Sequence, residues 1–332
     1  MSAGMTGEAG RGGSRGEGAR PTPGAVSVII VNWNGARLLG ECLDSLRAQT
    51  RQPDEVLVID NGSQDGSQAL LRERYPEVTL VEMGRNTGFS VANNVGLRRA
   101  RGEYIALLNN DVLLDAAWME RMAGALAADA ALGSCACKML FYDRRDTLDS
   151  AGITMGADGN SVNRGINQRD GATYAESARV FGACAGAALY RAALFADIGL
   201  FDEDLYIYYE DVDLSFRAQL AGYDCLYVPQ AIAFHHHSAS GGRLGKKHYY
   251  LTRNNLIVTL KNMPTPLLRR SLPRILGHQL QQALFLGLRG QAGTYTQAHR
   301  DVLRMLPGTL RKRRAIQRCA HRTSTEIDAR FT

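Results

Sequence analysis

VSVIIVNWNG, residues 26–35, is the stretch that decides the fold. A compact, β-branched apolar run stops at four turn-forming residues, and a helical spacing of apolar residues follows over 38–46. The same device recurs three more times, with strands predicted at 55–60, 78–83 and 104–109 and helices at 67–74, 90–100 and 116–128. Four such alternations predict an α/β fold, with a Rossmann-like, mostly parallel central sheet flanked by helices.

Polar side chains gather where these four strands end. They are Asn32, Asn34, Asp60, Arg85, Asn86, Asn109, Asn110 and Asp111. A single polar turn would say little, because every turn between a strand and a helix is polar. In parallel sheets, however, ligands bind outside the carboxyl ends of the strands, so four polar turns at one edge predict a ligand site.

Composition narrows the class of protein. The hydrophobic fraction of 45% and the charged fraction of 22% are typical of a globular protein. Six cysteines form no CxxC pair, which argues against a zinc knuckle, and Cys135 and Cys137 alternate as buried thiols of a strand would. We expect no membrane-spanning helix, because no apolar run reaches about 18 residues. Residues 1–24 are rich in glycine, lack the apolar core of a signal peptide, and predict a disordered leader.

The second half of the chain does not continue the regular alternation of strands and helices. Residues 152–171 predict a loop, and 183–191 predict a strand of small residues. A helix is expected from about Asp211, followed by strands at 225–229 and 231–236, a helix at 247–261, and further helices from 265. No GxGxxG motif follows the first strand, which argues against a dinucleotide-dependent dehydrogenase.

An acidic cluster opens the helix predicted near Asp211. Glu210, Asp211 and Asp213 fall within four residues, behind an aromatic segment that contains Tyr206, Tyr208 and Tyr209. Acids also favour a first helical turn through capping and the helix dipole, so a purely structural role stays open. A carboxylate that is partly desolvated by aromatic neighbours has a raised pKa and becomes a better proton acceptor near neutrality.

Six ordered segments together resemble the inverting glycosyltransferases of family 2. They are VSVIIVNWNG, VLVIDNGSQDGS, GRNTGFSVANNVGL, YIALLNNDV, YYEDVDLSFRAQLAGY and AFHHHS, within residues 26–260. The segment HYYLTRNNLI (248–257) and the basic tail are similar to the rhamnosyltransferase-like subgroup. The resemblance implies the A-type glycosyltransferase fold. It also implies a hexosyltransferase that moves a sugar, for example rhamnose, from a nucleotide-diphospho-sugar to a glycan or polyprenyl-diphosphate-linked acceptor in bacterial cell-surface polysaccharide synthesis.

The resemblance also implies roles for individual residues. Asn32, Asn34, Asp60, Arg85, Asn86, Asn109 and Asn110 would bind the donor. Asp111 and His235 would hold a divalent ion, Mn²⁺ or Mg²⁺, with His237 left open as an alternative. Asp211 would be the general base, and Glu210 and Asp213 would bind the acceptor or orient the base. Because Asn109 stands where the family's DxD motif has its first acid, we expect weaker metal binding in the absence of nucleotide.

The resemblance divides the chain at residue 262. Residues 25–262 would form the glycosyltransferase domain, with a nucleotide-sugar-binding half (25–130) and an acceptor and catalytic half (131–262). Residues 263–332 would form a basic, amphipathic helical tail. From Thr265 onward, 13 basic residues face three acids, and a leucine stripe runs along 268–284. With the basic cluster 311–314, that stripe predicts docking on an anionic membrane, although a solubilising end is the alternative.

Location and rival functions follow from the same features. We expect a cytoplasmic protein, peripheral on the inner face of the membrane, and no nucleic-acid partner, since no nucleic-acid-binding motif is present. The alternatives are a sugar nucleotidyltransferase and a non-catalytic nucleotide-sugar-binding relative. The neutral turn after residue 32 argues against the first, because a triphosphate needs a basic loop. Retention of Asp111 and Asp211 argues against the second.

Overall fold

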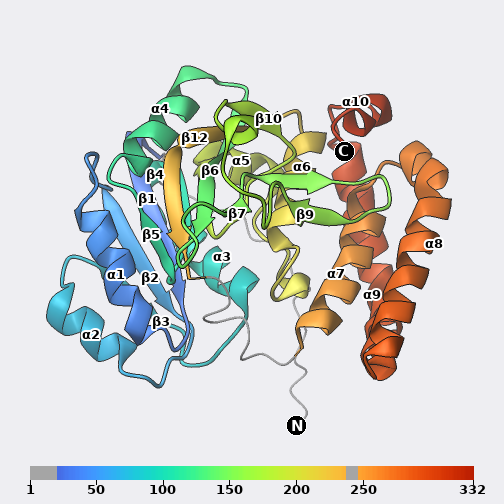
Figure 1. Cartoon of the computed structure of the whole chain (residues 1–332), viewed down its shortest axis with the longest axis horizontal. Coiled ribbons are helices and arrows are strands. Elements are labelled where there is room, and N and C mark those ends of the chain that lie inside the picture. The colour runs from blue at the N-terminus through green and yellow to red at the C-terminus, as the bar shows by residue number, and fades with distance from the viewer. Residues whose placement is uncertain (1–20, 237–245) are drawn as a thin grey trace, which may run out of the picture.

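The computed structural model describes residues 21–236 and 246–332, in which a ten-stranded sheet lies between helices and further helices pack at one side (Figure 1). The first half follows the predicted alternation. Its parallel strands are β1 (Thr22–Asn32), β2 (Glu55–Asp60), β3 (Thr79–Glu82) and β4 (Gly102–Asn109). Its helices are α1 (Ala36–Arg47), α2 (Ser67–Arg74), α3 (Phe89–Arg99) and α4 (Trp118–Ala128). The apolar spacing of α1 buries its core-facing side, as predicted.

The first strand begins earlier than the sequence indicated. Thr22 pairs with Gly102, and its N–H donates to the carbonyl of Arg101 at 2.9 Å, so the predicted leader ending at residue 24 was too long. The register shifts between Thr22 and Val26, where Gly24 has a φ of 73° that favours glycine. Because the pairing is irregular here, the first residues of β1 do not show the alternating pattern of a regular strand, and the sequence did not indicate them as strand. Residues 1–20 lie outside the part of the chain that the structure describes.

The second half of the sheet is mixed. The full order is β10-β12-β6-β11-β4-β1-β2-β3, with β11 (Ala187–Arg191) antiparallel to β4 and β6. The strand β12 (Asp224–His235) runs parallel to β6 (Leu132–Phe141). Short strands complete it: β5 (Val112–Leu114), β7 (Leu148–Ser150) and β10 (Ala178–Val180). Since β4 and β12 point the same way, their carboxyl ends meet at one edge.

Two predictions about this half were wrong. The strands expected at 225–229 and 231–236 are one strand, β12, which continues through a register shift between Val228 and Ile232 at Pro229. Proline lacks a backbone N–H and is therefore accommodated at a bulge rather than in a regular ladder. The loop expected at 152–171 contains a hairpin of β8 (Ile153–Met155) and β9 (Ser161–Asn163). The remaining short elements are η1 (Ala172–Tyr174), α5 (Ala192–Ile198), η2 (Glu203–Leu205) and α6 (Glu210–Leu220).

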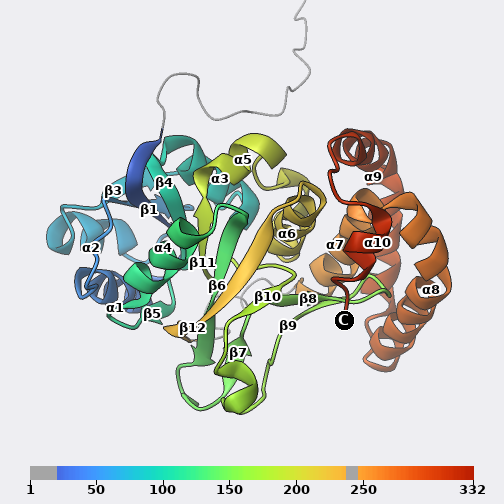
Figure 2. The ribbon, with the colours of Figure 1, turned by 90° about the horizontal axis from the view of Figure 1, so that it is seen from above.

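Four helices close the chain: α7 (Lys247–Asn262), α8 (Thr265–Leu288), α9 (Ala292–Arg318) and α10 (Ser324–Asp328). Figures 1 and 2 show α7 and α9 side by side, with α8 on the outside of the molecule. The tail is therefore helical, as predicted. Among the described residues, no helix combines the length and apolar character needed to cross a membrane.

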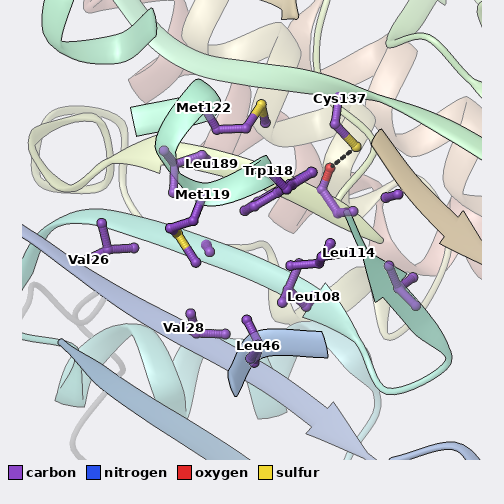
Figure 3. Packing of buried hydrophobic residues seen from close by; sticks show 14 of the residues in the cluster. Val26, Val28, Leu46, Leu108, Leu114, Trp118, Met119, Met122, Cys137 and Leu189 are labelled. Carbon is purple, nitrogen blue, oxygen red and sulfur yellow. Dashed lines mark hydrogen bonds between the residues drawn. The ribbon is translucent and has the colours of Figure 1, made fainter. Parts of the chain in front are cut away.

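The core lies on both faces of the sheet. On one face, Trp118, Met119 and Met122 of α4 pack towards Leu108 of β4 and Leu46 of α1 (Figure 3). The thiol of Cys137 lies in the same cluster and donates to the carbonyl of Ala187 at 3.2 Å. Cys135 and Cys137 are buried in β6, which confirms that they are strand thiols.

Candidate active site

A pocket of about 710 Å³ opens at the carboxyl edge of the sheet. Its lining includes the ends of β4 and β12 and the segment that leads into α6. The start of α7 and the start of α9 complete the lining. Of the predicted site residues, seven line this pocket: Asn86, Asn109, Asn110, Asp111, Glu210, Asp211 and His235.

The end of β4 supplies the amides and the carboxylate. Asn110 is buried and donates from Nδ2 to Oδ1 of Asn32 at 2.7 Å, so its side chain is held by the end of β1. Asp111 is 2% exposed, and its carbonyl accepts from the N–H of His236 at 3.0 Å. This backbone bond fastens the end of β4 to the end of β12, which brings together residues that lie 125 positions apart in the chain.

A carboxylate–imidazole–carboxylate row forms at this junction. Nε2 of His235 lies 3.3 Å from Oδ1 of Asp111, and Nδ1 lies 2.6 Å from Oδ2 of Asp149. Burial lowers the pKa of His235, but its hydrogen bonds and charge interactions with the two carboxylates outweigh burial and raise that pKa to about 9. His237, the open alternative, lies outside the described residues.

Asp149 is a pocket residue that the sequence reasoning missed. It lies in β7, an antiparallel partner of β6, and 86 positions separate it from His235. A carboxylate on the far nitrogen of a histidine fixes the ring's orientation and tautomer, as it does for histidine ligands of metals. No turn motif or periodicity marks a lone acid in a three-residue strand.

The donor set at the junction fits a divalent ion that arrives with further ligands. Carboxylate oxygen and imidazole nitrogen are ordinary ligands of such ions. Within the described residues, no three His, Cys, Asp or Glu side chains converge as a complete metal site. Asp111 and His235 would therefore supply only part of a metal site, and the remaining ligands would have to come from a bound molecule.

The first turn of α6 carries the acidic pair. Oδ1 of Asp211 accepts from the N–H of Val212 at 2.8 Å, and Oδ2 accepts from the N–H of Ala185 at 3.3 Å. Burial raises the pKa of Asp211, although these backbone donors oppose the shift. Burial and the neighbouring charge of Asp211 raise the pKa of Glu210 well above its usual range. A buried carboxylate with a raised pKa is suited to accept a proton near neutrality.

The segment before this pair is strained. Tyr206, Tyr208 and Tyr209 all have φ between 66° and 68°. Left-handed backbone costs a non-glycine residue about 1–2 kcal/mol, so neighbouring contacts must hold this segment in place. Tyr209 is the N-cap of α6, and the reversal at these residues turns Glu210 and Asp211 towards the pocket.

Four predicted donor residues do not line the pocket as the described residues form it: Asn32, Asn34, Asp60 and Arg85. The carboxylate of Asp60 is 1% exposed and accepts from Asn32, Ser63 and Gln68 at 2.8–3.1 Å. These bonds fix the turns after β1 and β2. The neighbouring Asn61 does line the pocket, and its Nδ2 donates to Oδ1 of Asn86 at 3.2 Å.

Asp213 has a structural place rather than an acceptor-facing one. It is fully buried and accepts from Arg217 at 2.9 Å, Lys261 at 2.7 Å and Asn262 at 2.7 Å. Lys261 also pairs with Asp202. Of the two readings that the sequence left open, the structure supports the helix residue, because Asp213 is enclosed by these partners and turned away from the pocket.

Aromatic residues form much of the remaining wall. Trp33, Tyr206, Tyr208 and Tyr249 line the pocket, and sequence reasoning noted only the tyrosines before α6. Tyr206 and Tyr208, which alternate in the segment before α6, were the signal in the sequence for this aromatic wall. Cys184 also lines the pocket, where burial raises the pKa of its thiol well above the usual range, which makes it a poor nucleophile.

Comparisons with known proteins identify the family to which the chain is similar. Residues 27–199 match the family described as Glycosyl transferase family 2. The chain is 31% identical to the N-acetylglucosaminyl-diphospho-decaprenol L-rhamnosyltransferase of Mycobacterium tuberculosis over 67% of this chain and 79% of that protein. It is 30% identical to the O-antigen biosynthesis protein RfbC of Myxococcus xanthus over 67% of this chain, but it spans only 18% of RfbC.

Solved structures share the fold. GalNAc-T7 with UDP, GalNAc and Mn²⁺ superposes with a TM-score of 0.58 at 17% identity, over 71% of this chain and 48% of that one. The mannosyltransferase PcManGT from Pyrobaculum calidifontis, in complex with GDP-Man and Mn²⁺, gives 0.52 at 20% identity over 94% and 86%. These likenesses confirm the predicted A-type glycosyltransferase fold.

Proposed function

Because the chain belongs to glycosyltransferase family 2, we propose that it transfers a sugar, with inversion, from a nucleotide-diphospho-sugar to a hydroxyl of a glycan or lipid-linked acceptor. One observation carries the proposal. Asp111 and His235, which could share a metal ion, and Asp211, a buried carboxylate whose pKa is raised, line the same pocket. Transfer needs these two capabilities on opposite sides of the reacting carbon.

The diphosphate of the donor would lie at the metal corner. Asp111 and His235 would hold Mn²⁺ or Mg²⁺ there, and the phosphate oxygens would complete the ligand set. The bound ion would stabilise the negative charge that develops on the leaving diphosphate. Asp149 would keep Nε2 of His235 pointed at this corner through its 2.6 Å contact with Nδ1. Asn61 and Asn86 would contact the rest of the donor, while Asp60 would act through the turns that it fixes.

Asp211 would act as the general base. It would accept the proton of the acceptor hydroxyl as that oxygen forms a bond to the anomeric carbon. The bond from that carbon to the diphosphate oxygen would break, and its electron pair would leave with the nucleoside diphosphate. Attack from the face opposite the leaving group inverts the configuration in one displacement, for which a single base suffices. Glu210, adjacent and buried, would bind or orient the acceptor.

The substrates are proposed from the relatives. The Mycobacterium tuberculosis relative is named as an L-rhamnosyltransferase that acts on a decaprenol-linked acceptor. By analogy, we propose a rhamnose-like donor and a polyprenyl-diphosphate-linked acceptor in cell-surface polysaccharide synthesis. Residues of α7, together with Gln291 and Thr294 at the start of α9, also line the pocket, and this wide lining supports an extended acceptor.

The outer face of α8 would dock on an anionic membrane at the cytoplasmic side. Five leucines there, the α8 leucine row, are 49–91% exposed: Leu272, Leu276, Leu280, Leu284 and Leu288. The helix carries three arginines and no acid; Arg270 pairs with Asp328, and Arg269 and Arg274 complement anionic lipid. Phe285, next to the row, contacts the ring of His248 at the pocket mouth, with centroids 6.1 Å apart. A lipid-linked acceptor could therefore pass from the bilayer to the pocket.

The basic cluster 311–314 contributes less to this surface than the sequence indicated. Lys312 pairs with Asp202 at 2.5 Å and Asp204 at 2.6 Å, and Arg313 donates to the carbonyls of Leu260 and Met263. Both side chains are thus engaged within the fold. Sedimentation with vesicles tests the docking. Replacing Leu276, Leu280 and Leu284 by serine should abolish binding to phosphatidylglycerol vesicles, whereas Gln281→Ser should not. Equal binding by both variants would contradict the proposal.

A donor screen tests the activity itself. A panel of UDP-, GDP- and dTDP-sugars would be incubated with Mn²⁺ or Mg²⁺ and a polyprenyl-diphosphate glycan, and released nucleoside diphosphate would be measured. We expect one donor to give metal-dependent release that chelation removes. Asp111→Ala should lose metal-dependent donor binding, while Asp211→Asn should bind the donor and not transfer. Release from no donor, or release unaffected by both substitutions, would overturn the proposed function.

A further inference from the structure

The segment Leu205–Tyr209, the base turn, precedes the proposed base in a strained conformation. Tyr206 has φ 66° and ψ −62°, and the N–H of Ile207 donates to the carbonyl of Leu205 at 2.8 Å. Together these define a γ-turn of the rare, strained kind. Tyr208 and Tyr209 then follow in left-handed backbone. Such conformations persist only where surrounding contacts over-determine them, and they cluster at functional sites.

Asn254 of α7 provides the central contact. Its side chain is fully buried, and Nδ2 donates to the carbonyls of Leu205 at 2.9 Å, Ile207 at 2.9 Å and Tyr208 at 2.7 Å. An amide nitrogen carries two hydrogens, so three carbonyls share two donors. This convergence is possible only while the turn keeps its shape.

The neighbours of Asn254 extend the contact. Arg253 donates from Nη2 to the carbonyls of Asp204 at 2.8 Å and Leu205 at 3.0 Å, and from Nε to Oδ1 of Asn254 at 2.9 Å. Asn255 donates to the hydroxyl of Tyr209 at 3.2 Å. Within the described residues, none of these three side chains lines the pocket. Arg253 also lies over the ring of Tyr249, a pocket residue, at 5.4 Å, and Asn255 also donates to the carbonyl of Gly159 at 2.7 Å. The base turn is the part of the site that all three side chains contact.

The base turn also reaches the donor side of the pocket. The hydroxyl of Tyr206 donates to Oδ1 of Asn86 at 3.2 Å, and its carbonyl accepts from the N–H groups of Phe89 at 2.7 Å and Ser90 at 3.2 Å. A Cβ on Gly88 would lie 2.5 Å from the Tyr206 ring, so the two are in close contact. One strained turn thus joins the donor-side loop to the residues that enter α6.

We propose that Arg253, Asn254 and Asn255, the α7 clamp, are positioning residues that hold the base turn and thereby aim Asp211 at the acceptor. The proposal rests on the proposed function, in which Asp211 is the base. The clamp does not contact the metal corner, which is built from β4, β7 and β12. Its loss should consequently reduce turnover while leaving metal-dependent donor binding in place.

Asn254→Asp tests the clamp, because the substituted side chain keeps its shape but places a carboxylate oxygen among three carbonyl oxygens. Hydrogen exchange measured by mass spectrometry should become about ten-fold faster in residues 204–211 and stay unchanged in β1 and β4. The kcat for the donor found in the screen should fall about 100-fold, as for a misplaced catalytic group. Affinity for the matching nucleoside diphosphate with Mn²⁺ should change less than about three-fold.

Thr259→Val is the matched control, since it removes a buried hydroxyl of α7 that faces Gly159 and not the base turn. It should leave both exchange at 204–211 and kcat near the wild-type values. If Asn254→Asp does not fold, Arg253→Lys, which loses the bonds to two carbonyls, should show the same pattern more weakly. Unchanged local exchange, unchanged kcat, or an equal effect of Thr259→Val would overturn the clamp. Exchange needs no substrate, so it separates this failure from failure of the proposed function.

Discussion

Replacing Asp211 by asparagine should lower the rate of transfer and change how the stability of the protein depends on pH. Asparagine keeps the shape of the side chain but cannot accept a proton. General-base assistance contributes about 10²- to 10⁴-fold to rate, so kcat should fall by that factor, which corresponds to about 3–5 kcal/mol of activation free energy. Donor affinity should hardly change, because the diphosphate of the donor would be held by Asp111, His235 and their ion rather than by Asp211.

The effect on stability follows from the raised pKa of Asp211. Since the folded-state pKa lies above the unfolded value, the ionised carboxylate destabilises the fold, and this penalty grows as pH rises above the unfolded pKa. Asparagine removes the penalty. The free energy of unfolding should therefore shift in favour of the variant by up to about 1.4 kcal/mol per pH unit between the two pKa values.

A constant term opposes this gain. The carboxylate accepts from the N–H groups of Ala185 and Val212 on separate oxygens, and asparagine offers only one acceptor oxygen. The lost bond should cost about 1–3 kcal/mol at every pH. The change of the stability difference with pH is consequently the diagnostic quantity. Whether the variant is more or less stable than the wild type at any single pH is not diagnostic.

Thermal unfolding of both proteins between pH 4 and pH 8 measures that slope, alongside nucleoside diphosphate release at pH 7. We expect the Tm of the variant to gain on that of the wild type as pH rises, and transfer to be nearly abolished. Parallel Tm curves would refute the assignment of a buried, high-pKa carboxylate to Asp211. Transfer at a near wild-type rate would refute its role as the base.

Three further substitutions test other parts of the site. Asp149→Asn should weaken Mn²⁺ binding in the presence of nucleoside diphosphate about 10- to 100-fold, measured by calorimetry, because an outer-shell partner is lost; unchanged affinity would contradict this role. Lys261→Met should destabilise the protein by about 3–5 kcal/mol in denaturant titrations at pH 7, because Asp202 loses a buried partner. Although burial raises it, Lys261 and Lys312 lower the pKa of Asp202. The loss of stability caused by Lys261→Met should therefore shrink as pH falls through the usual carboxyl range, and a pH-independent loss would count against the pairing. Gly88→Ala should lower donor affinity and stability together, since its φ is +87° and the Tyr206 ring occupies the space; wild-type values in both assays would exclude this crowding.

Much of the fold could be predicted from the sequence because one pattern, a short apolar strand followed by polar residues and a helix, is repeated. Each parallel strand is a short apolar run that ends in polar residues, and the carboxyl ends of such strands meet at one edge. That rule placed Asn86, Asn109 and Asp111 at the pocket before any coordinates were considered. The rule failed for Asp60. A carboxylate at a strand end can instead accept all its hydrogen bonds from the neighbouring turns, as the three donors to Asp60 show.

Contacts made by irregular or antiparallel segments were not readable. Asp149 reaches His235 through the pairing of β7 with β6, and nothing in its neighbourhood marks that partner. The structural role of Asp213 could have been predicted, because Arg217 follows four residues later on the same helix and can pair with it. The base turn was beyond prediction, because left-handed tyrosines oppose local preference and are imposed by Asn254 from 46 or more residues away.

The pairing of Lys312 with Asp202 and Asp204 bears on how this enzyme could be dissected. The region that matches the family ends at residue 199, and it contains Asp111 but neither Asp211 nor His235. A fragment ended at 262 would regain both, yet would leave Asp202 and Asp204 without Lys312 and the carbonyls of Leu260 and Met263 without Arg313. The shortest piece that keeps these contacts would thus extend through most of α9. Exchanging the tails of two relatives would then require moving the acidic partners of Lys312 as well.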